Sequence, residues 1–269
     1  GDNAAAAVGT GVVEDGRAFA TIGTSGVVFA HTDKLSIDPQ GRVHTFCCAV
    51  PGAWHVMGVT LAAGQSLKWY RDNFCDADKV EADKQGVDPY DLMTAEAAKT
   101  PIGSNRLIYL PYLMGERTPH LDPDCRGAFV GLSGMHTRYD LVRAVMEGVT
   151  FSLRDCAEIL RGMGVQSDVI LACGGGGSSA FWRQMMADIL GCPVATTISK
   201  EGPALGVAIL AGVGAGLYPS VPEACRKIVG VNASQAPVAE HVAEYDKFYE
   251  IYRGLYPALK DSWHKLAEL

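Results

Sequence analysis

Long hydrophobic runs, basic clusters and metal-binding cysteine pairs are all absent from this sequence of 269 residues. The longest apolar run, at 206–216, contains glycine and is shorter than the ~20 residues that a membrane-spanning helix needs. The formal net charge is −7, and lysine and arginine do not cluster, which argues against a protein that binds nucleic-acid phosphates. None of the eight cysteines forms a Cys-x-x-Cys pair, the spacing typical of zinc sites. We therefore expect no membrane span, no nucleic-acid partner and no metal ligand in this chain.

The cysteines are expected to be free thiols, several of them in the core. Cys173, for example, ends an apolar stretch at 169–173, where a thiol behaves as a small hydrophobic side chain. A reducing, cytoplasmic setting is the simplest inference from such cysteines. Because the chain begins without methionine, on Gly1 and Asp2, we interpret it as part of a larger protein.

Apolar runs and turns divide the first part of the chain into two predicted β-hairpins and a helix. Runs at 18–22 and 27–30 flank the turn Gly23–Gly26, which is a hairpin signal. The further elements predicted here are a second β pair at 43–50 and 54–59, a helix over 61–74, an exposed connection at 76–91, a buried strand at 106–113 and a polar loop at 115–120.

Strand-helix units are predicted in the remainder of the chain. The clearest helix begins after Thr137, with Asp140 in the position of a capping box. A strand at 168–173 runs into four successive glycines, and Ser178 or Ser179 can cap the helix that follows. The other predicted elements are a strand at 194–198 and helices at 203–210 and 245–266. With hairpins first and strand-helix units later, the chain is predicted to form an α/β fold around a mixed sheet.

Two of the turns, 23–26 and 174–177, have the composition of phosphate-binding loops. Glycine lacks a Cβ atom, so backbone N–H groups can approach phosphate oxygens closely, and hydroxyl groups add further donors. The alternative for the first turn is an ordinary hairpin loop. Four successive glycines exceed what a tight turn needs, and their entropic cost indicates a ligand that packs against this backbone. A weak dinucleotide fingerprint that begins at Gly175, with Glu201 downstream, is a rival interpretation of the second turn.

Asp2, followed by Asn3, is the candidate proton acceptor of a phosphotransferase. The alternative is that Asp2 caps a helix, since aspartate before an alanine run is a good N-cap. Glu116 and Arg117 can simply pair with each other in their loop. Structural or surface roles are expected for three isolated histidines and core roles for three tryptophans: His44, His55, His120, Trp54, Trp69 and Trp182.

Together these segments resemble the FGGY family of carbohydrate kinases, and within it the C-terminal half of the xylulokinases. The resemblance covers almost the whole chain, and its most specific part is a long signature that joins 127–132 to 140–147. The other segments that carry it are Gly1–Gly9, which is similar to the family's catalytic aspartate segment, Gly23–Val27, similar to its phosphate hairpin, Gly115–His120, and Gly174–Met185, similar to its adenosine-binding turn and helix.

The resemblance implies a ribonuclease H-like fold, as in actin, hexokinase and the chaperone ATPases. It also implies that residues 1–269 form the C-terminal, nucleotide-binding domain of a kinase whose N-terminal, sugar-binding domain lies outside this chain. ATP, a magnesium ion, a small sugar and that other domain are the implied cofactors and partners. The sequence does not specify an oligomeric state, and a homodimer is compatible with it.

The resemblance further implies ATP-dependent phosphorylation of a ketopentose, with D-xylulose favoured over other sugars or polyols. Asp2 would be the catalytic base and Asn3 a second sugar contact. The residues implied to bind the nucleotide are Gly23, Thr24 and Ser25 at the phosphates and Gly175, Gly176 and Ser179 at the adenosine. A non-catalytic, nucleotide-binding sugar regulator and a dinucleotide-dependent oxidoreductase remain as alternatives.

Overall fold

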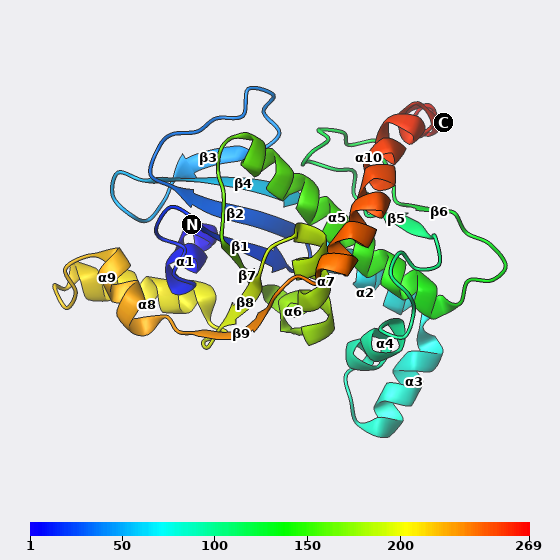
Figure 1. The fold of residues 1–269 in the computed structure, drawn as a ribbon, viewed down its shortest axis with the longest axis horizontal. Helices are drawn as coiled ribbons and strands as arrows, with labels where there is room; N and C mark the ends of the chain where they lie inside the picture. Colours follow the sequence, from blue (N-terminus) through cyan, green and yellow to red (C-terminus); the bar gives the residue numbers. More distant parts are fainter.

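The computed structural model describes residues 1–269, which fold around a seven-stranded mixed sheet with helices on both faces (Figure 1). The strand order is β3-β4-β2-β1-β7-β8-β9, and β1, β7 and β8 are parallel neighbours while the other pairs are antiparallel. The strands of this sheet are β1 Arg17–Ile22, β2 Gly26–Thr32, β3 His44–Cys47, β4 Trp54–Thr60, β7 Val169–Cys173, β8 Val194–Thr197 and β9 Val231–Gln235. Two short strands, β5 Ile108–Leu110 and β6 Ala128–Val130, pair separately. The mixed α/β sheet predicted from the sequence is confirmed.

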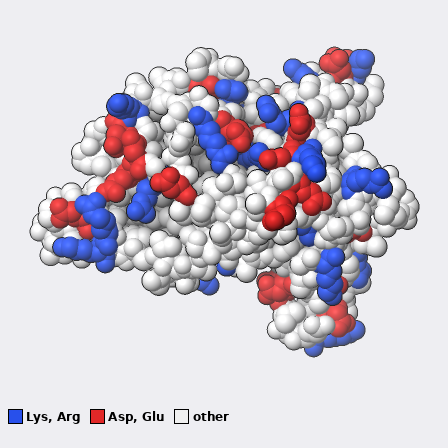
Figure 2. Space-filling model, in the orientation of Figure 1, with Lys and Arg blue, Asp and Glu red and all other residues white.

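Ten helices surround the sheet, and none of them is long and apolar enough to cross a membrane. They are α1 Asp2–Gly9, α2 Gly64–Phe74, α3 Asp76–Gln85, α4 Pro89–Ala97, α5 Arg138–Gly162, α6 Gly174–Ser178, α7 Ala180–Leu190, α8 Gly202–Gly214, α9 Val221–Ile228 and α10 Ala239–Ala267. On the face of the molecule shown in Figure 2, acidic and basic side chains lie among one another, and no extended basic patch forms.

Alternation along the strands divides the core into two parts, one on each face of the sheet. Phe19, Phe29 and Leu171 face α1 and pack with its Ala7. The intervening residues, such as Ala18 and Ala30, face the opposite side and belong to the main core with α5. This two-sided burial explains why all seven residues of β2 are buried.

Glycines let α1 and α8 pack against each other at backbone distance. A Cβ atom on Gly9 would lie 1.8 Å from the carbonyl oxygen of Gly202, and one on Gly206 would lie 1.8 Å from that of Ala5. Such contacts are possible only where neither helix carries a side chain at the crossing. Helix α8 therefore fixes the position of α1, and with it that of Asp2.

Helix α10 is held to the centre of the fold by tyrosines. Tyr245 donates a hydrogen bond to the buried Glu147 of α5 (3.0 Å), and Arg143 binds both of these residues. Tyr249 donates to Asp155 of the same helix (2.7 Å). These contacts, and the burial of Tyr252, make α10 part of the main core.

Several local predictions are confirmed. The two hairpins form, and β1 and β2 pair through the expected turn, with Ile22 opposite Gly26. Helix α5 begins after Thr137 with the predicted capping box to Asp140. Ser179, and not Ser178, caps α7 by accepting a hydrogen bond from the N–H of Trp182.

The segment 76–91 is mostly exposed, as predicted, but it is wrong that it is a connection, because helices α3 and α4 occupy this region. Both helices bury part of their surface, including Ala82 and Met93, against the rest of the fold. Asp88 is the N-cap of α4, and Pro89 lies in its first turn. This pair is a helix start signal, which we overlooked because the segment is polar. The strand predicted at 106–113 is also shorter than expected, since only Ile108–Leu110 pair with β6.

The expected pair between Glu116 and Arg117 does not form. Glu116 is only 4% exposed, and its carboxylate accepts hydrogen bonds from the hydroxyl of Thr60 (2.6 Å) and the N–H of Leu61 (3.0 Å). Arg117 contributes only its backbone N–H, at 2.7 Å. Burial raises the pKa of Glu116 to about 7.

We expect Glu116→Gln to change how stability depends on pH. The folded pKa of Glu116 lies above the ordinary value of 4.5, so the free energy of unfolding contributed by this group is present below pH 4.5 and is lost as the pH rises through 7. Glutamine accepts the same backbone hydrogen bonds without a charge. In urea unfolding, the difference in the free energy of unfolding between variant and wild type should therefore shift by about 1–3 kcal/mol in favour of the variant as the pH rises from 5 to 8. The exposed Glu240→Gln is the matched control, and an equal difference at both pH values would contradict this explanation.

Candidate active site

The parallel pairing of β1 with β7 brings the two glycine turns together. Thr21 lies opposite Cys173, so the residues that follow each strand, at 23–26 and 174–177, leave the sheet side by side. Both turns also border the same cavity, which has a volume of about 460 Å³. The two turns therefore meet at one site, although they lie about 150 residues apart in the sequence.

Five of the residues implied as nucleotide contacts line this cavity, namely Gly23, Thr24, Gly175, Gly176 and Ser179. Ser25, Asp2 and Asn3 are not among its lining residues. The side chain of Ser179 is already engaged, because its hydroxyl oxygen accepts the N–H of Trp182 at the start of α7. Trp182 itself is 3% exposed and also lines the cavity.

The first turn is held to the start of α2 by its carbonyl groups. The oxygen of Gly23 accepts the N–H of Gly64 (2.7 Å), and the oxygen of Thr24 accepts those of Ala63 (3.0 Å) and Gln65 (3.2 Å). The N–H groups of Thr24 and Ser25 make no hydrogen bond within the protein. The turn is therefore rigid and leaves donors free, which is the arrangement that suits phosphate oxygens.

Most of the four successive glycines are explained by packing within the protein. Gly174 has a φ of +76°, and Cβ atoms on Gly176 and Gly177 would lie 2.5 Å from Ile22 and 2.9 Å from Ala172. Packing within the protein therefore already accounts for glycine at these three positions, and the number of glycines alone does not indicate a ligand. At Gly175, by contrast, nothing lies within 4 Å of a Cβ atom, and this residue borders the cavity. Among the four glycines, Gly175 is the one at which an added side chain would meet no protein atom.

Sequence reasoning missed the side of the cavity that α2 and α4 form. Lys68 of α2 borders the cavity while pairing with Asp72 at 2.7 Å. Tyr90 of α4 also lines it, with the guanidinium group of Arg71 stacked 4.5 Å from its ring centre. The other residues from this side are Gln65, Asp88, Asp91 and Thr94. Asp88, Tyr90 and Asp91 were missed because 76–91 was interpreted as an exposed connection. Gln65, Lys68 and Thr94 lie outside that segment and belong to no recognisable motif.

Asp2 lies in the first turn of α1, exposed to solvent, where Gly1 takes the N-cap position. Its Oδ1 accepts the N–H of Asn3 at 3.0 Å. The alternative interpretation of Asp2 as the helix N-cap is therefore wrong by one residue. The first turn of a helix favours a negative charge, so this carboxylate suits its position.

The histidines expected to be structural pack against aromatic rings. His55 stacks on Phe29 with ring centres 4.3 Å apart, and His120 stacks on Tyr256 at 3.4 Å. His264 lies near Asp122 and Asp124, but Asp122 already accepts hydrogen bonds from His264 and Tyr256. These contacts fasten α10 to the loop that contains Asp122. All eight cysteines are free thiols, as expected.

The fold is that of sugar kinases in the actin and hexokinase fold group, which confirms the predicted ribonuclease H-like fold. Residues 18–215 match the FGGY family of carbohydrate kinases, C-terminal domain. Because that match covers most of the chain, this protein belongs to the FGGY family.

Among its relatives, xylulose kinase of Bacillus subtilis (strain 168) is 38% identical over 260 residues, which cover 97% of this chain and 50% of the relative. The crystal structure of ligand-bound xylulose kinase from Lactobacillus acidophilus superimposes with a TM-score of 0.86 at 29% identity, covering 97% of this chain and 51% of that one. Gluconate kinase from the same species has a TM-score of 0.86 at 30% identity, with the same coverage. The chain thus spans about half the length of the curated relatives it matches.

Proposed function

We propose that residues 1–269 form one domain, the nucleotide-binding half of an ATP-dependent sugar kinase. The observation that carries this proposal is the meeting of two glycine turns at one cavity, with N–H donors at 24 and 25 that no protein acceptor uses. A triphosphate supplies the acceptors that such donors lack. The free space at Gly175 supports a nucleotide in the same cavity.

In the proposed reaction, Asp2 accepts the proton of a sugar hydroxyl as its oxygen attacks the γ-phosphoryl group, and Asn3 contacts the sugar. The first turn, with Gly23, Thr24 and Ser25, holds phosphate oxygens through its N–H and hydroxyl groups. Gly175, Gly176 and Ser179 border the adenosine. Magnesium, when bound with ATP, would neutralise phosphate charge. Asp88 and Asp91 are the carboxylates that line this cavity.

The proposed partner of this domain is the other half of a longer kinase. The chain spans about half the length of its relatives, and α8 leaves an apolar surface open beside α1. Val207 on α8 is 58% exposed, and Leu217 just beyond the helix is 74% exposed. Helix α1 carries Asp2, so a partner covering this surface would lie next to the proposed catalytic base.

D-xylulose is the proposed sugar, since xylulose kinases are 37–38% identical to this chain over nearly its whole length. A gluconate kinase superimposes equally well, so gluconate is the second candidate. A coupled assay of ADP release by the longer protein, with pentuloses, hexuloses, glycerol and gluconate, tests the choice. We expect the highest kcat/KM with D-xylulose. Higher values with gluconate would shift the assignment, and no ADP release with any acceptor would support a non-catalytic regulator.

A further inference from the structure

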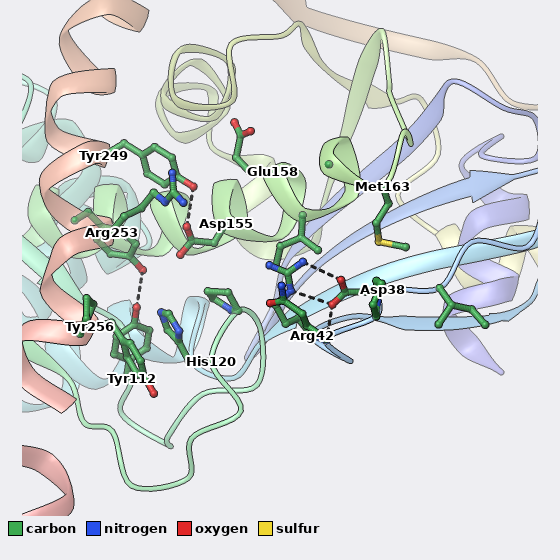
Figure 3. A pocket seen from close by; sticks show the side chains of 18 of the residues that line it. Asp38, Arg42, Tyr112, His120, Asp155, Glu158, Met163, Tyr249, Arg253 and Tyr256 are labelled. Atoms are coloured by element: carbon green, nitrogen blue, oxygen red, sulfur yellow. Dashed lines mark hydrogen bonds and ion pairs between the residues drawn. The ribbon is translucent and has the colours of Figure 1, made fainter. Parts of the chain in front are cut away.

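A second and larger cavity, of about 780 Å³, lies on the α5 side of the sheet (Figure 3). Helix α5 forms one side, α10 a second, and the segment 36–42 together with Pro119 and His120 the rest. It shares no lining residue with the cavity at the glycine turns. Its volume is within the range of about 300–1,000 Å³ that is usual for ligand pockets. Nothing in the proposed kinase reaction uses it.

The wall at 36–42 is fixed by an internal ion pair. Arg42 binds Asp38 with two side-chain hydrogen bonds, from Nε (2.9 Å) and Nη2 (2.8 Å), and its own N–H donates to the same carboxylate. The hydroxyl of Thr118 donates to the carbonyl of Arg42 and ties the wall to the neighbouring loop. Arg42 also holds the pKa of Asp38 at about 2. The wall is therefore preformed, and its two charges cancel.

The opposite wall presents aromatic rings with polar ends. The hydroxyls of Tyr112 and Tyr252 lie 3.4 Å apart, and the ring of Tyr256 is held by its stack on His120. Burial lowers the pKa of His120 to about 4, so its ring is neutral near pH 7. This wall can therefore contact both the carbon skeleton and the hydroxyl groups of a ligand.

Asp155 offers this cavity a carboxylate oxygen that the protein itself does not use. It projects from α5, is 7% exposed, and accepts the hydroxyl of Tyr249 at Oδ1 (2.7 Å). Its Oδ2 makes no hydrogen bond within the protein and points into the cavity (Figure 3). This oxygen is accessible from the cavity, so it can accept a hydrogen bond from a ligand. Burial raises the pKa of Asp155 to about 7, so near neutral pH the group can accept or donate.

The charges around the cavity favour a neutral ligand. Asp155 and Glu158 stand on the α5 side and Arg253 on the α10 side, so an anion or a cation would each meet a group of its own sign. We propose that this cavity binds a neutral polyhydroxylated molecule, a sugar or sugar alcohol, with Asp155 and Arg253 as its polar contacts and Tyr112, Tyr252 and Tyr256 packed along its carbon skeleton. This second sugar site is separate from the proposed reaction centre and does not depend on it.

A plug variant tests the proposal. Gly162 lines the cavity, and nothing lies within 4 Å of a Cβ atom there, so Gly162→Trp fills the space without displacing the fold. Gly254, a helical glycine of α10 that does not line the cavity, has equally free surroundings and serves as the control Gly254→Trp. The probes are xylitol, D-xylulose and glycerol, titrated into the 269-residue chain and measured by calorimetry and ligand-observed NMR.

We expect saturable binding of at least one probe to wild type, to Gly254→Trp and to Asp2→Ala. Gly162→Trp and Asp155→Asn should each weaken it at least tenfold. Circular dichroism checks that both variants fold. If Asp155→Asn does not fold, the binding measured with Gly162→Trp alone tests the proposal. No saturable binding of any of the three probes overturns the proposal. So does binding that survives in Gly162→Trp but is lost in Asp2→Ala, because the sugar would then occupy the proposed reaction centre.

Discussion

Asp2→Ala, made in the proposed longer kinase, should lower kcat for sugar phosphorylation by at least ~10²-fold while the Kd for ADP stays within about twofold of wild type. Loss of a proton acceptor slows only the chemical step, and Asp2 is not among the residues that line the nucleotide cavity. The substitution should not unfold α1, because an exposed first-turn aspartate contributes only about 0.3–1 kcal/mol. ADP release and calorimetry measure the two effects.

Asp2→Asn separates the role of a base from that of a positioning group. Asparagine keeps the size and the hydrogen-bonding oxygen of Asp2 but cannot take up the proton, so it should be nearly as inactive as alanine. Asp261→Ala, at another exposed aspartate, is the matched control and should leave kcat unchanged. Sugar phosphorylation near the wild-type rate in Asp2→Ala would show that this carboxylate is not the base.

Gly175→Trp should weaken nucleotide binding by at least ~100-fold, or about 2.8 kcal/mol. Gly175 borders the cavity and has no positive φ, and nothing lies within 4 Å of its Cβ position, so the added indole can enter the space proposed for the nucleotide. The Kd for ADP and the KM for ATP of the longer protein should rise together. The KM for the sugar should change much less, because Asp2 and Asn3 lie outside this cavity.

Gly134→Trp is the matched control, since Gly134 also has nothing within 4 Å of a Cβ atom and does not line the cavity. Gly176→Trp is unsuitable for this test, because a Cβ atom there would already lie 2.5 Å from Ile22. An unchanged Kd for ADP in a folded Gly175→Trp protein would place the nucleotide elsewhere.

Local sequence signals predicted the elements that are bounded by recognisable turn or capping residues. The turn at 23–26 gave the first hairpin, and Thr137 with Asp140 marked the start of α5, because in both cases neighbouring residues supply the hydrogen bonds. The same reasoning failed at 76–91, where α3 and α4 bury only a few of their residues and show little amphipathic pattern. Tyr90 was consequently absent from the predicted site. Lys68 was absent for another reason, since its helix was predicted but no motif linked it to the cavity.

The pairing of strands that are distant in the sequence could not be predicted from local patterns. The two turns share a cavity because β1 pairs with β7, and no spacing in the sequence specifies which strands become neighbours. For the same reason, the sequence could not reveal the internal role of Gly176, since its close approach to Ile22 exists only after that pairing. The resemblance to the FGGY family predicted the fold, whereas the roles of Asp2 and Asn3 stay predictions.

The match to the family ends at residue 215, but the hydrophobic core also includes residues beyond that position. Tyr245, Tyr249 and Tyr252 of α10 lie in the same core as α5, and Tyr245 shares the buried ion pair of Arg143 with Glu147. A chain trimmed to the matched region would keep the ion pair of Arg143 and Glu147 but lose the tyrosines that cover it. The surface of α5 that packs against α10 would then be exposed to solvent. Any shortened version made for crystallisation or engineering should therefore retain the last helix, whatever boundary a family alignment draws.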